Sequence, residues 1–267
     1  MRIRIAHETN YRYEPETRWV NQNARLTPRS FDSQYVLRWR VSVDLDGALR
    51  HFEDSLGNFA HSFSHPKPLK SFVVAAIGEV ETNDAVGVVR GAVETLPSSM
   101  FLRASAHAQA NGKLRDFTAA TIAESADPLD RLHRLMEAIH NEIACDGEAP
   151  FARGGAVEAF ALKKANAGDL AHVFIAAARY LEIPARYVSG YALPAPGEWA
   201  SGMTAWAEAL APDLGWVAFD CAHNVCPDAR YVRVAVGFDS ASAAPLRSSH
   251  SGVGVETVAT ALQIQAA

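Results

Sequence analysis

The segment from Ala167 to Tyr191 constrains the fold of this chain more than any other stretch of its sequence. Apolar residues recur at helical spacing after Ala167, and Pro184 then stops the helix. Residues 186–191 follow at once and form an alternating run that is typical of a β-strand. The segment therefore predicts a largely apolar, buried helix that leads through a proline into a strand.

Two later runs, 205–210 and 216–220, alternate in the same way and supply further strands of an antiparallel sheet. Upstream, Asp127-Pro128 starts another helix, because proline is well tolerated in a first helical turn. Its apolar face is formed by Leu129, Leu132, Leu135, Met136 and Ile139. Residues 112–245 are therefore predicted as an α+β domain in which helices pack on an antiparallel sheet.

Residues 1–90 consist of short alternating segments, such as 36–43 and 72–80, separated by turn pairs such as Asp46-Gly47. This pattern predicts an N-terminal antiparallel β domain over residues 1–90. A connection rich in Pro, Ser and Ala follows over residues 91–111. Residues 246–267 are predicted to be a tail whose final strand, 262–265, returns to the N-terminal sheet.

The composition is typical of a globular protein with two small domains, with 49% hydrophobic and 21% charged residues in 267. The net charge is −5 and no basic block exists, which argues against a nucleic-acid partner. No run approaches the ~20 apolar residues that span a bilayer, so we expect no membrane partner. Three cysteines, Cys145, Cys221 and Cys226, make no disulfide framework. We expect a cytoplasmic protein.

The segment 165–191 resembles the catalytic helix and following strand of bacterial transglutaminase-like proteins, which share the papain-like cysteine-hydrolase core. Asp169-Leu170-Ala171-His172 is similar to the Asp-Phe-Ala-His of that family, and residues 183–191 are similar to its Ile-Pro-Ala-Arg-Tyr-Val-Ser-Gly-Tyr. The N-terminal β domain of the family is matched by three further motifs, which are His7-x-Thr9-x-Tyr11-x-Tyr13, Leu26-Thr27-Pro28-Arg29 and Asp54-x-x-Gly57-Asn58. The resemblance covers nearly the whole chain.

The resemblance implies that two of three catalytic positions are replaced. Ala167 stands where the family carries its nucleophilic cysteine, Thr204 stands where it carries its histidine, and Asp220 matches its carboxylate. A methyl group cannot supply a thiolate, and a threonine hydroxyl does not titrate near neutral pH. The chain is therefore predicted to be a pseudoenzyme without a cofactor, which binds a peptide or protein segment in the former cleft or scaffolds a partner. Asp169, Tyr187, Tyr191 and Trp206 are the residues predicted to bind it.

Other hypotheses remain open at this point. Cys221 is a candidate relocated nucleophile of a hydrolase or acyltransferase, beside Asp220 and His223. The spacing Cys221-x-His223-x-x-Cys226 also suits a metal, although it supplies three ligands at most and structural zinc usually has four. In a further hypothesis the chain is a structural subunit, a homo-oligomer that assembles through its N-terminal β domain.

Overall fold

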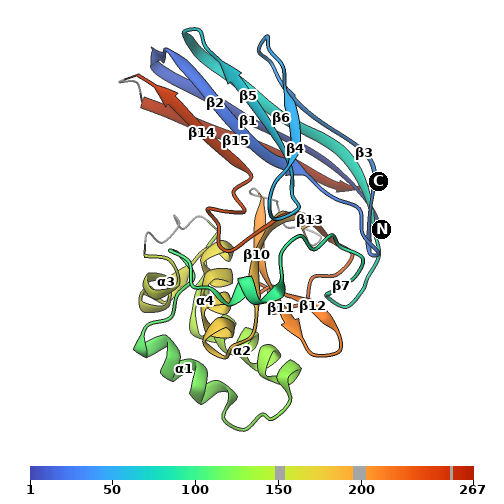
Figure 1. The fold of residues 1–267 in the computed structure, drawn as a ribbon, viewed down its shortest axis with the longest axis vertical. Helices are drawn as coiled ribbons and strands as arrows, with labels where there is room; N and C mark the ends of the chain where they lie inside the picture. Colours follow the sequence, from blue (N-terminus) through green and yellow to red (C-terminus); the bar gives the residue numbers. More distant parts are fainter. Residues whose placement is uncertain (148–153, 195–202, 253–254) are drawn as a thin grey trace.

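The computed structural model of this chain describes residues 1–147, 154–194, 203–252 and 255–267. A sandwich of two β-sheets is stacked end to end with a mixed body of helices and sheet (Figure 1). Both chain ends lie on the sandwich, where Ile3 pairs with Ala266. The α+β class predicted from the sequence is confirmed.

The sandwich contains two antiparallel sheets with the strand orders β15-β1-β6-β3 and β14-β2-β5-β4. Inward and outward residues alternate along β1, as a strand with one buried face requires. The C-terminal residues complete both sheets, since β14 pairs with β2 and β15 pairs with β1. The strands are β1 (Arg2–Thr17), β2 (Trp19–Thr27), β3 (Gln34–Val43), β4 (Arg50–Glu53), β5 (Phe59–His65), β6 (Leu69–Thr82), β14 (Leu246–Ser251) and β15 (Val255–Ala266).

The second sheet system is the antiparallel core sheet, with the order β13-β10-β11-β12-β7. Its first four members in this order come from the predicted second domain, whereas β7 comes from the end of the predicted N-terminal domain and pairs with β12. The strands are β7 (Val88–Val89), β10 (Ala185–Ala192), β11 (Thr204–Ala211), β12 (Gly215–Phe219) and β13 (Tyr231–Gly237).

Helix α4 is the central helix of the core and is buried from Gly168 to Arg179. It packs against the small residues of β11, which allow the helix to approach the sheet closely. Strands β8 and β9 form a short parallel pair, and β9 comes directly before α4 in the chain. No helix in the described ranges is long and apolar enough to cross a membrane. The remaining elements are η1 (Ser98–Leu102), α1 (Gly112–Ile122), α2 (Pro128–Glu142), β8 (Ala144–Cys145), α3 (Ala156–Leu162), β9 (Lys164–Ala165) and α4 (Ala167–Tyr180).

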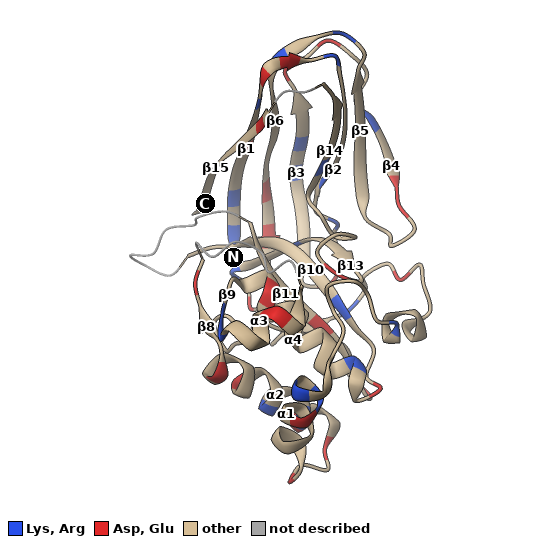
Figure 2. Cartoon of the chain, turned by 90° about the vertical axis from the view of Figure 1, so that its left-hand side faces the viewer, with Lys and Arg blue, Asp and Glu red and all other residues tan. Residues whose placement is uncertain are grey.

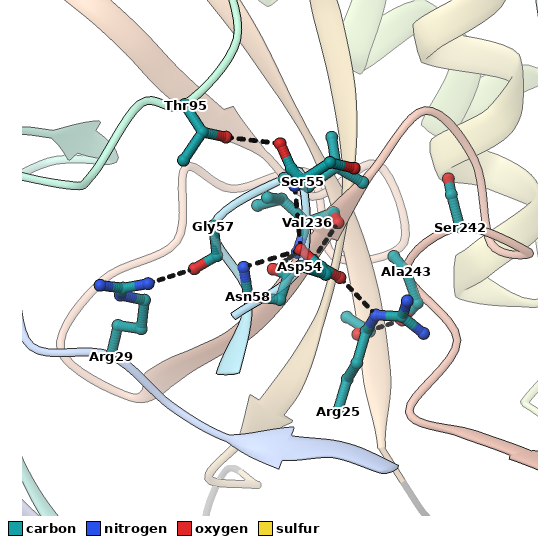
Figure 3. Close-up of polar contacts among 12 residues, drawn as sticks. Arg25, Arg29, Asp54, Ser55, Gly57, Asn58, Thr95, Val236, Ser242 and Ala243 are labelled. Carbon is teal, nitrogen blue, oxygen red and sulfur yellow. Dashed lines mark hydrogen bonds and ion pairs between the residues drawn. The ribbon is translucent and has the colours of Figure 1, made fainter. Parts of the chain in front are cut away.

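The turn between β4 and β5 joins the sandwich to the edge of the core sheet (Figure 3). The Asn58 side chain donates to the carbonyl of Val236 (2.9 Å) and accepts from its backbone N–H (2.8 Å). Asp54 holds this turn, because it accepts from the Asn58 backbone (3.0 Å) and from Arg25 Nε (2.7 Å). Burial opposes the charge on Asp54, but these hydrogen bonds outweigh it and lower the pKa of the carboxyl. Asn58 therefore occupies the place of a neighbouring strand beside β13.

Candidate functional site

The three positions aligned with a catalytic triad lie toward one end of the core sheet. The last turn of α4 leads through Pro184 into β10, and Leu210 N donates to Pro184 O (2.9 Å) near the end of β11. The start of α4 therefore lies toward the opposite end, where β11 begins at Thr204 and β12 ends before Asp220. Ala167 also packs on the core cluster that contains Cys221. The close approach of the three side chains as a triad stays a prediction.

Helix α4 starts with a conventional N-cap. The Asn166 side chain accepts from Asp169 N (2.9 Å), which satisfies one of the N–H groups that lack an intrahelical partner. Ala167 is the first helical residue and is half-buried. The fold thus presents a methyl group at the head of a buried helix.

Asp220 orients a histidine, and that histidine is His223. The carboxylate is 1% exposed and accepts from Tyr231 OH (2.8 Å), from Ala222 N (2.9 Å) and from His223 Nδ1 (2.8 Å). The His223 side chain is 57% exposed. Backbone hydrogen bonds between Asp220 and Val225 (2.9 and 3.2 Å) close the turn that brings the pair together. This pair was not predicted from the sequence, because it depends on the backbone geometry of the turn between Asp220 and Val225.

The Cys221 thiol points into the apolar core on the α4 side of the sheet and is 2% exposed. Burial, followed by the negative charge of Asp220, raises its pKa well above the ordinary value. A nucleophilic cysteine needs the opposite setting, in which nearby positive charge stabilises the thiolate. The environment of Cys221 therefore favours the unreactive thiol.

The other two cysteines also have raised pKa values, although one of them contacts a histidine. Cys145 has an exposed side chain on β8, opposite Ala165 of β9, and partial loss of solvent around its sulfur, together with the charges of Asp220 and Asp146, raises its pKa. Cys226 Sγ lies 3.6 Å from His133 Nε2, and burial raises its pKa.

The Cys221, His223 and Cys226 side chains therefore have separate surroundings. Cys221 lies in the core, His223 is held by Asp220, and Cys226 lies beside a helix α2 histidine. Within the described ranges, no three His, Cys, Asp or Glu side chains are grouped in a way that could hold a metal ion. The metal hypothesis gains no geometric support from these residues.

The four residues predicted to bind a ligand are all buried in this structure, and their role in binding stays a prediction. Asp169, Tyr187, Tyr191 and Trp206 are 1%, 3%, 0% and 2% exposed. The Tyr187 ring packs against the His172 ring with 5.0 Å between the ring centres. The Tyr191 hydroxyl is hydrogen-bonded to His7 Nδ1 of the sandwich at 2.8 Å. Both tyrosines therefore help to build the interior.

Trp206 lies on the face of the core sheet away from α4, together with Val188 and Tyr231. The strand alternates, so its neighbours Ala205 and Ala207 are the residues that meet the helix. Trp206 also borders a small hollow on its own face, which is lined further by Glu208, Tyr231 and Arg233 among other residues. The space between α4 and β11 is therefore bordered by small alanine side chains and not by this tryptophan.

A buried ion network lies on the same face as Trp206. Glu208 is completely buried and is held by Arg186 Nε (2.6 Å) and Arg233 Nε (2.8 Å). Burial works to raise the pKa of Glu208, but the two guanidinium groups outweigh it and lower the pKa to about 2. Because each charge of this network has a close partner, we assign it a structural role.

Comparison with known proteins agrees with this architecture. Residues 115–221, from α1 to the end of the Asp220 segment, match the transglutaminase-like superfamily, and residues 3–81 match the bacterial transglutaminase-like N-terminal region. The core and the N-terminal region of this chain are therefore both transglutaminase-like. The matched core region contains all three aligned positions, Ala167, Thr204 and Asp220.

Two proteins show the extent of the similarity to this transglutaminase-like chain. An uncharacterized protein of Mycobacterium leprae is 27% identical over 277 aligned residues, which cover 98% of each chain. The crystal structure of a candidate cysteine protease from Cytophaga hutchinsonii superposes with a TM-score of 0.79 at 21% identity, and covers 99% of this chain and 90% of that one. At this identity, the structural likeness supports the shared fold.

Proposed function

We propose that this transglutaminase-like protein is a pseudoenzyme that binds a peptide or protein segment at the head of α4. The observation that carries the proposal is the methyl group of Ala167 at the first position of the buried central helix. In enzymes with this fold, a cysteine at that place is the nucleophile, and the N-terminal end of the helix helps to lower its pKa. Alanine has no atom that can attack a carbonyl group.

The surrounding residues support the proposal. In a comparable serine triad, loss of the nucleophile lowers kcat by about 10⁶, because the members act as a unit. Thr204 supplies no imidazole, and Asp220 already accepts hydrogen bonds on both oxygens. The Cys221 thiol does not replace the missing nucleophile, because burial keeps it protonated. Neither the position of Ala167 nor the buried Cys221 therefore supplies a nucleophile for a thiol-dependent reaction.

The same end of the sheet keeps accessible surface for a ligand. Ala167 and Thr204 are half-buried, and the side chain of His223 is more than half exposed. Asp220 fixes the orientation of the His223 ring, so the ring loses little freedom when a ligand contacts it. These three residues, rather than the four buried ones predicted from the sequence, are the surface that we assign to binding.

The proposal is tested by blocking the head of α4. Peptides are selected from a random library with the unmodified full-length chain, and their affinities are then measured by fluorescence polarisation. Ala167→Arg fills the proposed site and should weaken binding by about 10-fold or more. Ala161→Arg adds the same side chain at an exposed position of α3 and should leave the affinity unchanged. Equal affinity in both variants, with thermal melting showing both folded, would contradict binding at this site.

A further inference from the structure

Strand β15 forms one outer edge of the sandwich (Figure 1). It spans 12 residues and pairs with β1 from Val255 to Ala266 on one side, while no described strand pairs with its other side. On the outer side, alternate backbone N–H and C=O groups therefore point away from the sheet. A strand of this length can accept another strand through its backbone.

The edge is almost free of charge. Glu256 is the one ionisable residue of β15, and its carboxylate accepts hydrogen bonds from Tyr13 (2.8 Å) and Ser248 (3.1 Å). Figure 2 shows the contrast with β1, along which basic residues recur. Two apolar side chains are exposed here, since Val255 is 71% and Val258 is 49% exposed.

The other sheet edges carry devices that prevent strand addition, as natural edges usually do. The core sheet ends at β7, which has two residues, and at β13, which Asn58 covers at Val236. The three remaining edges of the sandwich bear ionisable side chains, which are Arg38 and Arg40 on β3, Arg50, His51 and Glu53 on β4, and Arg247 and His250 on β14. Strand β15 is longer than any of these edge strands, and its single ionisable side chain, Glu256, is held by Tyr13 and Ser248.

The sequence of β15 is complementary to itself in the antiparallel direction. A two-fold axis at Thr260 pairs Val258 of each copy with Leu262 of the other, and these residues face the same side of the sheet because their numbers differ by four. The two Glu256 residues then stand eight positions apart, which is about 26 Å at the rise of a strand. That separation exceeds the Debye length of about 8 Å, so their repulsion is screened.

We infer that β15 is the interface of a homodimer. A second copy of the chain adds its own β15 in the antiparallel direction, so that the two four-stranded sheets join into one sheet of eight strands. The closed two-fold pairing satisfies the outward backbone groups of both strands and covers Val258. The interface uses the sandwich and leaves the head of α4 untouched, so it is independent of the proposed binding function.

Sedimentation velocity on the full chain tests the inference. The unmodified protein should sediment with twice the 28.9 kDa mass of the monomer and dissociate on dilution. Thr260→Lys and Thr260→Glu each place two like charges face to face at the axis, so each variant alone should be monomeric. An equimolar mixture of the two variants should recover the dimer, because opposite charges then meet.

Ser71→Lys is the matched control, because it adds the same charge at an exposed position of β6, an inner strand of the same sheet. It should leave the dimer intact. A monomeric mass for the unmodified protein at every concentration would overturn the inference, and so would a dimer that survives Thr260→Lys. A mixture of folded Lys and Glu variants that stays monomeric would overturn it as well.

Discussion

Replacing Asn58 by alanine tests how strongly one side chain fastens the sandwich to the core sheet. Asn58 is 3% exposed and makes two hydrogen bonds to the backbone of Val236, which is also 3% exposed. Alanine removes both partners while Val236 stays buried, so one N–H and one C=O are left unsatisfied. Each such group costs about 1–3 kcal/mol, which gives an expected loss of about 2–6 kcal/mol in the free energy of unfolding.

Equilibrium unfolding in urea measures this loss. Asn23→Ala is the matched control, since Asn23 is an exposed asparagine of β2, and the change should stay within about 0.5 kcal/mol. Hydrogen exchange should also become faster at the Val236 amide in Asn58→Ala, because that N–H has lost its acceptor. If Asn58→Ala is as stable as Asn23→Ala, the reasoning about this joint is refuted.

Three further predictions follow from buried titratable groups. Glu208→Gln should lower the free energy of unfolding in urea by about 3–5 kcal/mol, because it leaves buried guanidinium charge without its partner. In the unmodified protein the stabilisation by ionised Glu208 is present above pH 4.5 and should be lost as pH falls toward its pKa of about 2. Burial lowers the pKa of His7 to about 4, so its contribution is complete above pH 6.5 and should decline between pH 6.5 and 4; His7→Gln should flatten that part of a Tm-against-pH profile. In alkylation by iodoacetamide followed by mass spectrometry, exposed Cys145 should react well before Cys221, and equal rates would contradict the burial of Cys221.

The helix that carries the site was predictable from local sequence. Apolar residues at helical spacing and Pro184 predicted a helix from near Ala167, and α4 begins at Ala167 and ends at Tyr180. The strands after it were predictable for the same reason, because short alternating runs correspond to β10, β11 and β12. The N-terminal antiparallel β domain was also predicted and is confirmed. The final strand, predicted over 262–265 beside the N-terminal sheet, lies within β15, which pairs with β1.

The orientation of side chains on the core sheet was not predictable in the same way. Both faces of this sheet are covered, so alternation along β11 does not tell that its alanines meet α4 while Trp206 lies on the opposite face. The burial of Tyr191 depends on His7, which lies 184 residues away in the sequence. The role of Asn58 depends on the edge of β13, although its motif was visible in the sequence. The positions of Trp206, Tyr191 and Asn58 all depend on contacts between segments that are far apart in the sequence.

The pairing of Asp220 with His223 was missed for a different reason. The resemblance to the family aligned its catalytic histidine with Thr204. His223, three residues after Asp220, was therefore considered only as a metal ligand or as a base for Cys221. The backbone bonds between Asp220 and Val225 turn the chain so that His223 meets the carboxylate. Such a turn is a matter of geometry within six residues, which residue types alone do not specify.

The central claim, that this chain is a pseudoenzyme, is tested most directly by measuring thiol-dependent hydrolysis and amine transfer on glutamine-containing peptides. The unmodified protein should show no turnover, and Ala167→Cys alone should give little. Ala167→Cys with Thr204→His should be the minimum change that recovers measurable turnover, because it restores the thiol and the imidazole beside Asp220. Turnover in the unmodified protein that disappears on Cys221→Ser or Cys145→Ser, or that a chelator removes and zinc restores, would contradict the account.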